Sequence, residues 1–202
     1  MEEKANVFLD LDQTLIFGEE ATKFDYAKNK DAAKKFRFHN MDGFYIIFER
    51  PGVQDFLTFL FDNFNVSVWT AASKDYALFV IDKVVLAGNS NRKLNYIFFS
   101  YHCKISEIKT DRQKYLKLLW DTFNLKGYNK NNTIIIDDYK DEVYKAQPHN
   151  CILAPVFEFK KGSENDTFLK ELKEKLRELA EAVKKGDSVK NAVDSINKNN
   201  KN

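Results

Sequence analysis

Cysteine, histidine and proline are scarce in this chain, whose 202 residues include 2 cysteines, 3 histidines and 3 prolines. Cys103 and Cys151 form no CxxC pair and the histidines are scattered, so the residue spacing of a zinc site is missing. We expect a reduced protein with two partly buried thiols; a single disulfide between them is the alternative. Few prolines and 18 phenylalanines favour an aromatic-rich globular core.

Long apolar runs and an excess of one charge are also missing. No stretch approaches the roughly 18 apolar residues of a transmembrane helix. Residues 1–6 lack the basic and apolar regions of a signal peptide. The 32 basic and 30 acidic side chains leave a net charge of +2, which argues against a general nucleic-acid binder. We therefore expect a soluble intracellular monomer that contacts neither nucleic acid nor a membrane.

Short apolar runs alternate with stretches of helical periodicity along the chain. The apolar runs predict strands at 7–11, 65–69, 96–99, 133–136 and 151–154. The periodic stretches predict helices at 53–64, 75–86, 111–123 and 165–185. Strands that alternate with helices predict an α/β fold with a Rossmann-like parallel sheet flanked by helices.

Two further segments complete this organisation. The polar segment 22–39 predicts irregular structure, with a loop or a short helical turn at 28–35. Asp42-Gly43 lies between the aromatic runs 36–38 and 44–48 and predicts a small β-hairpin flap. No insertion is long enough to predict a large cap domain.

The chain reads as a single domain over residues 1–185 followed by a tail. The helix expected at 165–185 carries one apolar stripe, which we expect to pack on the sheet; binding of a partner is the alternative. Residues 186–202 are poor in apolar side chains and rich in asparagine and lysine, which predicts a disordered tail.

Polar side chains follow three of the expected strands at the point where each strand ends. Asp10 and Asp12 follow the first, Thr70 the second, and Asp137 and Asp138 the fourth. The carboxyl ends of parallel strands meet at one sheet edge, where such folds bind ligands. Asp10 and Asp12 share one side of the chain if the extended geometry continues to residue 12. The pattern favours a metal-binding carboxylate site; a capped turn is the alternative.

The motif at 10–14 and four further motifs give these residues a wider context. Asp10-Leu11-Asp12-Gln13-Thr14 resembles the signature of haloacid-dehalogenase-like phosphotransferases. In order along the chain follow RPGVQDFL at 50–57, VWTAASKDYA at 68–77, KYLKLLW at 114–120 and NNTIIIDD at 131–138. Together they resemble the phosphatases of the RNA polymerase II C-terminal repeat domain, the small C-terminal-domain or NLI-interacting-factor-like phosphatases. The resemblance covers residues 5–157 and implies a haloacid-dehalogenase-like fold.

This resemblance implies a role for each matching residue near the first motif. Asp10 matches the nucleophile that becomes an aspartyl phosphate, and Asp12 the general acid and base. Asp10, Asp12 and Asp138 match the Mg²⁺ ligands, Asp12 through its backbone carbonyl. Thr14 is expected to hold the turn.

The remaining motifs imply phosphate contacts. Thr70 and Ala71 match the phosphate-binding residues, and Lys114 matches the lysine that neutralises phosphate and nucleophile. Lys109 and Lys117 are rivals for that role in the same stretch. Asp137 is expected as a second metal ligand or as support for the site. Magnesium and lysine would offset the charge of carboxylates and phosphate.

The chain departs from the family at two places. Tyr139 follows Asp138 where the family often has serine, and Ser100 and Tyr101 stand where it often has an arginine. The expected function is a Mg²⁺-dependent phosphoserine/phosphothreonine protein phosphatase, with the polymerase tail as a candidate phosphoprotein substrate. The alternatives are a phosphatase of a small ester or a nucleic-acid phosphate end, and a non-catalytic interaction module.

Overall fold

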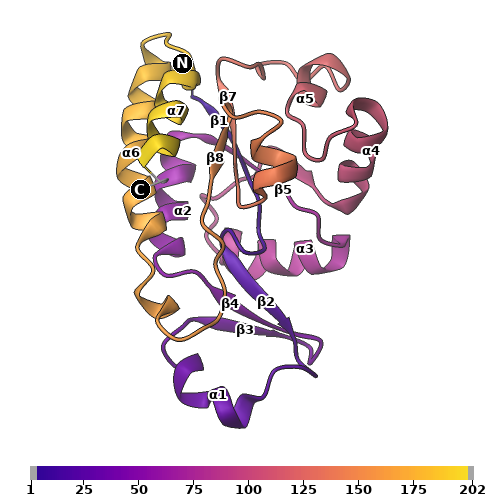
Figure 1. The fold of residues 1–202 in the computed structure, drawn as a ribbon, viewed down its shortest axis with the longest axis vertical. Coiled ribbons are helices and arrows are strands. Elements are labelled where there is room, and N and C mark those ends of the chain that lie inside the picture. Colours follow the sequence, from indigo (N-terminus) through magenta and orange to yellow (C-terminus); the bar gives the residue numbers. More distant parts are fainter. Residues whose placement is uncertain (1–3, 200–202) are drawn as a thin grey trace.

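A computed structural model describes residues 4–199 and shows an α/β fold (Figure 1). A five-stranded, fully parallel sheet has the order β6-β5-β1-β7-β8. Its strands are β1 (Asn6–Leu9), β5 (Asn65–Trp69), β6 (Ile97–Phe98), β7 (Thr133–Asp137) and β8 (Cys151–Leu153). The expected Rossmann-like sheet is confirmed, and the central strands β1 and β7 are buried along their whole length.

Alternating side chains of β1 enter two separate cores because successive residues of a strand point to opposite faces. Val7 and Leu9 join the core under one layer of helices, whereas Phe8 joins the core on the other face. The first layer contains α2 (Val53–Asn63), α3 (Lys74–Val80), η1 (Ile81–Leu86), α6 (Phe168–Lys184) and α7 (Val189–Asn199). The second contains α4 (Ser100–Thr110), α5 (Lys117–Asp121) and η2 (Lys140–Tyr144). Helices thus cover both faces of the sheet.

A small antiparallel sheet of order β2-β4-β3 lies beyond the carboxyl ends of the large sheet (Figure 1). Its strands are β2 (Ile16–Glu20), β3 (Phe38–Met41) and β4 (Tyr45–Glu49), with α1 (Tyr26–Ala33) between β2 and β3. The hairpin is confirmed: Asp42 and Gly43 have φ of 46° and 78°, as its tight turn requires. The strand β2 was not predicted, because its glycine and two glutamates weaken the strand pattern.

The helix expected at 111–123 forms only in part. Asp111 and Lys114 have left-handed backbones, with φ of 55° and 46°, and only Lys117–Asp121 is α-helical in this region. The preceding segment instead forms α4, which the sequence did not suggest because its apolar residues make a weak stripe. The chain turns at Lys114, and this turn carries the lysine toward the sheet edge.

The C-terminal region also differs from the prediction. The long helix α6 is present, but Val189–Asn199 forms a further helix, α7, where a disordered tail was expected. Val189, Val193 and Ile196 are buried against the sheet layer, and Asn197 accepts a hydrogen bond from the Leu153 amide at 3.0 Å. These three residues are the apolar stripe of α7. Because the stripe is short and its surroundings are polar, the sequence pattern did not predict the helix. Residues 200–202 lie outside the described part.

A buried arginine joins the first motif to the start of α6. Arg50 donates to both carboxylate oxygens of Asp166, at 2.9 and 2.8 Å, and to the carbonyls of Thr14 and Pro155, each at 3.0 Å. The arginine side chain is fully buried, so its charge depends on Asp166 for compensation.

We expect Asp166→Ala to lower the free energy of unfolding by about 3 kcal/mol, because it leaves the buried charge of Arg50 uncompensated. Urea unfolding measures this loss. Glu174→Ala breaks an exposed pair with Arg177 on α6 and is the matched control, expected to stay within about 0.5 kcal/mol of wild type. Equal losses in the two variants would contradict the anchoring role of Arg50.

Both cysteines are free and buried, which confirms the expectation of thiols. Burial raises the pKa of each thiol, so neither is primed to react as a thiolate.

Among residues 4–199, none of the helices combines the length and the apolar character needed to cross a membrane.

Candidate active site

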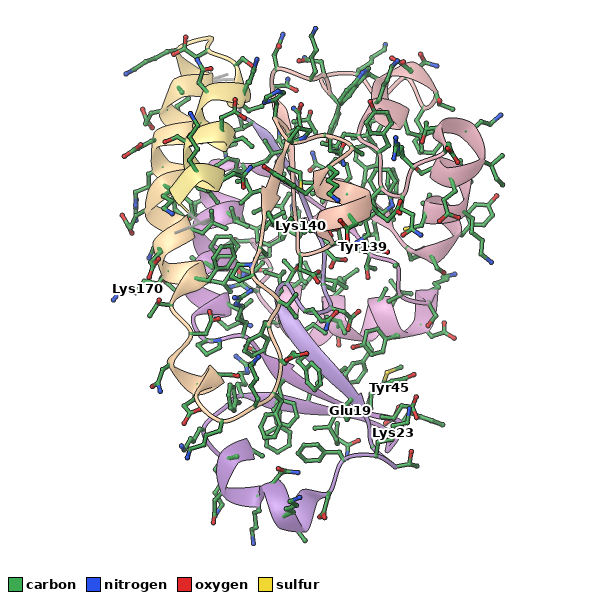
Figure 2. The ribbon with its side chains drawn as sticks, in the orientation of Figure 1. Glu19, Lys23, Tyr45, Tyr139, Lys140 and Lys170 are labelled. Carbon is green, nitrogen blue, oxygen red and sulfur yellow. The ribbon has the colours of Figure 1, made fainter. Side chains whose placement is uncertain are left out.

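The polar residues expected at the strand ends meet in one pocket of about 280 Å³. Residues after β1, after β5 and at the end of β7 contribute to its wall, as the parallel topology requires. The lining residues are Asp10, Asp12, Gln13, Thr70, Ala71, Ala72, Lys114, Asp137, Asp138 and Tyr139. Figure 2 labels Tyr139, at the start of η2, above α3.

Lys114 is the centre of the buried charge cluster. Its Nζ lies 2.6 Å from Asp10 Oδ1 and 2.8 Å from Asp137 Oδ2, and all three side chains are at least nine-tenths buried. The side-chain amide of Gln147 holds the turn by accepting from the Leu116 amide and donating to the Lys114 carbonyl, each at 2.9 Å. The structure therefore brings Lys114 into the site.

The two rival lysines stay outside the pocket. Lys117 pairs with Asp121 at 3.4 Å on the surface of α5. Lys109 is exposed near the end of α4. The geometry thus selects Lys114 among the three.

Burial and charge act in opposite directions within this cluster. Burial favours the neutral form of Lys114, but Asp10 and Asp137 outweigh it and raise the pKa of the ammonium above its ordinary value. Burial raises the pKa of Asp10, and the neighbouring Lys114 ammonium opposes that shift. A charged lysine in direct contact favours the ionised form of a buried carboxylate.

Thr14 lies between two of the carboxylates. Its hydroxyl is 3.2 Å from Asp138 Oδ1 and 3.4 Å from Asp10 Oδ2. The chain reaches this position through a tight turn, in which the Leu11 carbonyl accepts from three following amides and Gln13 has φ of 60°. The extended geometry ends at Leu9, so Asp10 and Asp12 do not lie side by side on a strand.

The Asp12 carboxylate takes a different direction from that of Asp10. Its Oδ1 accepts a hydrogen bond from the Tyr76 hydroxyl at 2.7 Å. Burial raises the pKa of Asp12, while the Tyr76 bond opposes that shift. Tyr76 was not singled out from the sequence, because nothing in its local pattern distinguishes it from a core aromatic of α3.

Three carboxylates remain as candidate metal ligands. Asp10, Asp137 and Asp138 each offer an oxygen atom, and these atoms lie within 4.8 Å of one another. Burial raises the pKa of the Asp138 carboxyl, and repulsion from Asp137 raises it further. A hard divalent cation bound by carboxylate oxygens fits this donor set. Asp137, expected as a second ligand or as support, stands in this trio, and the Asp12 carboxylate does not.

Thr70 and Ala71 line the same pocket as the acidic cluster. The Thr70 hydroxyl oxygen accepts from the Ala72 amide at 3.1 Å, which orients the hydroxyl group at the end of β5. The Thr70 amide in turn donates to the Phe98 carbonyl of β6 at 2.9 Å. A hydroxyl oxygen that accepts one bond still has a proton to donate to an oxyanion.

Comparison with known proteins shows the family of this chain. It matches the NLI interacting factor-like phosphatase family over residues 5–189. The chain belongs to this phosphatase family. Protein 355R of Invertebrate iridescent virus 6, described as CTD phosphatase-like, is 43% identical over 176 residues, covering 85% of this chain and 96% of the viral protein. The counterpart in Invertebrate iridescent virus 3 is 39% identical, covering 82% and 91%.

A more distant relative and two solved structures are also similar to this chain. The ubiquitin-like domain-containing CTD phosphatase 1 of Xenopus tropicalis is 25% identical over 65% of this chain and 42% of its own length. The solved structure of Fcp1, an essential RNA polymerase II CTD phosphatase, has a TM-score of 0.68 at 18% identity, covering 92% of this chain. A fission yeast Fcp1 variant bound to beryllium fluoride has a TM-score of 0.57 at 20% identity and 89% coverage. This NLI interacting factor-like chain spans 64% and 51% of those solved chains.

Proposed function

We propose that this NLI interacting factor-like protein is a Mg²⁺-dependent phosphoserine/phosphothreonine phosphatase that works through an aspartyl phosphate on Asp10. The buried contact of Lys114 with Asp10 carries the proposal, because it places a charge-compensated carboxylate in a pocket at the strand ends. Membership of a phosphatase family supports the reaction class. Phosphoryl transfer depends mainly on positioning and on charge neutralisation, and this pocket offers both.

In the first step, a carboxylate oxygen of Asp10 attacks phosphorus as the bond to the leaving oxygen breaks. Asp12 gives its proton to that leaving oxygen, and the raised pKa of Asp12 helps it to hold the proton beforehand. In the second step, Asp12 takes a proton from water, whose oxygen attacks phosphorus and breaks the bond to Asp10. Inorganic phosphate leaves, and both carboxyl groups return to their starting states.

The other residues of the pocket bind the phosphoryl group or the metal. Lys114 and the Thr70 hydroxyl, with the backbone of Ala71, face the phosphoryl oxygens. Asp10 and Asp138 would hold Mg²⁺ together with the Asp12 carbonyl, and Asp137 supports Lys114 at 2.8 Å. When bound, Mg²⁺ supplies positive charge that offsets the phosphate and the carboxylates.

A phosphoprotein is the substrate class that fits best. The insertion between β1 and β5 amounts to a small sheet, α1 and α2, so the described part of the chain leaves the pocket open to a segment of protein. The relatives named CTD phosphatase-like make the polymerase tail a candidate. Ser100 and Tyr101 lie at the start of α4 where the family often has an arginine, so we propose that the protein binds the polymerase C-terminal repeat more weakly.

Removal of the metal tests the cofactor. We expect EDTA to lower the rate of phosphate release at least about tenfold and Mg²⁺ to restore it. Asp138→Asn is expected to raise the Mg²⁺ concentration needed for half-maximal activity. Asp141→Asn, at an exposed pair with Lys145 nearby in sequence, is the control and should leave that concentration unchanged. Activity that survives complete chelation argues against a metal-dependent enzyme.

The substrate is tested with phosphoserine and phosphothreonine peptides, the polymerase-tail repeat among them, against a panel of small phosphate esters. Preference for peptides supports the proposal. Preference for a metabolite or for a nucleic-acid phosphate end would keep the chemistry and reject the substrate class. Inactivity of the folded, Mg²⁺-loaded protein toward every ester would favour an interaction module.

A further inference from the structure

One contact links helix α3 to the proposed general acid. The Tyr76 hydroxyl donates to Asp12 Oδ1 at 2.7 Å, and the tyrosine is 8% exposed. Tyr76 comes from α3, whereas Asp12 belongs to the turn after β1. A short bond to a carboxylate from a fixed ring restricts the rotation of that carboxylate.

Gly18 of β2 makes room for this hydroxyl. A Cβ atom at residue 18 would lie 2.0 Å from the Tyr76 oxygen, 3.1 Å from the ring carbon that bears it, and 3.5 Å from Asp12 Oδ1. Gly18 is not among the residues of positive φ, so its backbone conformation would accept alanine. The glycine is therefore required by the close approach of Tyr76 and not by the strand.

The small sheet also supports the ring of Tyr76. Tyr45 of β4 packs edge-on against it, with ring centroids 5.0 Å apart and planes at 76°. In the register of the sheet Tyr45 pairs with Glu20, two residues from Gly18 on the same strand. Figure 2 shows Tyr45 and Glu19 together below α3. The small sheet thus determines where the Tyr76 hydroxyl can lie.

We propose that Tyr76 and Gly18 are positioning residues that orient Asp12 as the acid of the first chemical step. The inference rests on the proposed function. With Oδ1 engaged by Tyr76, Oδ2 is the oxygen left to carry the proton to the leaving group. The same bond holds the carboxylate apart from the trio of Asp10, Asp137 and Asp138, which it would otherwise be able to join as a metal ligand.

The dependence of the rate on the leaving group separates positioning from packing. A serine or threonine alkoxide is a poor leaving group and needs a proton from Asp12, whereas an aryl oxide with a low pKa leaves without one. We expect Tyr76→Phe to lower kcat for a phosphoserine peptide about tenfold or more, with less than about a threefold change for p-nitrophenyl phosphate and little change in either KM.

Gly18→Ala gives an independent route to the same state, because it displaces the hydroxyl without removing it. It should reproduce the selective loss on the phosphoserine peptide. In the double variant, phenylalanine has no oxygen atom for the Cβ at residue 18 to clash with. Gly18→Ala should therefore cause little further loss of kcat beyond that of Tyr76→Phe. Tyr45→Phe keeps the ring contact and removes a neighbouring hydroxyl; it is the control, with a wild-type ratio of the two rates.

Each outcome has a distinct meaning. A loss that is equal for the two esters in both variants would overturn the positioning role, since disturbed packing lowers all activities alike. Losses that multiply in the double variant would overturn the coupling of Gly18 to Tyr76. A wild-type protein active on both esters with an unchanged ratio in Tyr76→Phe rejects this inference alone. A wild-type protein inactive on both esters rejects the proposed function and this inference with it.

Discussion

Asp10→Asn is expected to lower kcat for phosphate release by at least about a thousandfold while the protein stays folded. The amide nitrogen and oxygen of asparagine are far weaker nucleophiles than a carboxylate. The fold should survive because asparagine matches aspartate in size and because Lys114 keeps Asp137 as a partner at 2.8 Å. Loss of function without loss of structure is the signature of a residue that acts on the substrate.

Two measurements check this result. Steady-state phosphate release gives the loss, and thermal unfolding shows that the variant is folded. Mass spectrometry after an acid quench should find phosphate on the peptide that contains Asp10 in wild type and not in the variant. Asp42→Asn, at the hairpin turn and outside the pocket, is the control with unchanged turnover. Turnover in Asp10→Asn near the wild-type rate would remove Asp10 as the nucleophile.

Lys114→Met is expected to cost both activity and stability. It leaves Asp10 and Asp137 buried without their shared cation, next to Asp138. Breaking a buried ion pair from one side typically costs about 3–5 kcal/mol of the free energy of unfolding. Activity should fall as well, because the positive charge that faces the phosphoryl group and compensates Asp10 is lost. Lys109→Met replaces an exposed lysine and is the matched control.

The pH dependence of the Lys114→Met variant identifies the cause. Burial already raises the pKa of Asp10 in the wild-type protein, and the Lys114 ammonium opposes this shift. Without the ammonium the pKa rises further, so the folded state binds more protons than the unfolded state above the ordinary range of aspartate. The free energy of unfolding must then increase as the pH falls through the raised pKa. We expect the deficit relative to wild type to shrink as the pH falls through this raised pKa, above the ordinary range of aspartate.

Chemical denaturation across that range measures the deficit. If the loss in free energy of unfolding does not depend on pH, its cause is lost packing around the lysine stem and not the uncompensated carboxylates. Added Mg²⁺ should restore part of the stability, since a cation that binds the site only in the folded state stabilises that state by mass action. No such recovery would argue against Asp10 and Asp138 as Mg²⁺ ligands.

The sequence by itself determined the parts of this protein that depend on local pattern. Continuous apolar runs such as 133–136 produced buried parallel strands, and Asp42-Gly43 produced the hairpin, because strand burial and turn geometry are encoded in neighbouring residues. The parallel order then brought Asp10, Thr70 and Asp138 to one sheet edge. The four motifs led to the family, which the match over residues 5–189 confirms.

Only the tertiary structure decided how these groups face one another. The left-handed turn at Lys114, which replaces the first part of an expected helix, directs the ammonium to Asp10 and Asp137. Contact across elements turns Asp12 toward Tyr76, with Gly18 leaving the space. Helix α7 forms because three spaced apolar residues find a buried surface on the sheet layer. Such contacts join residues far apart in the chain, so no local pattern carries them; they exist once the strands and helices have packed.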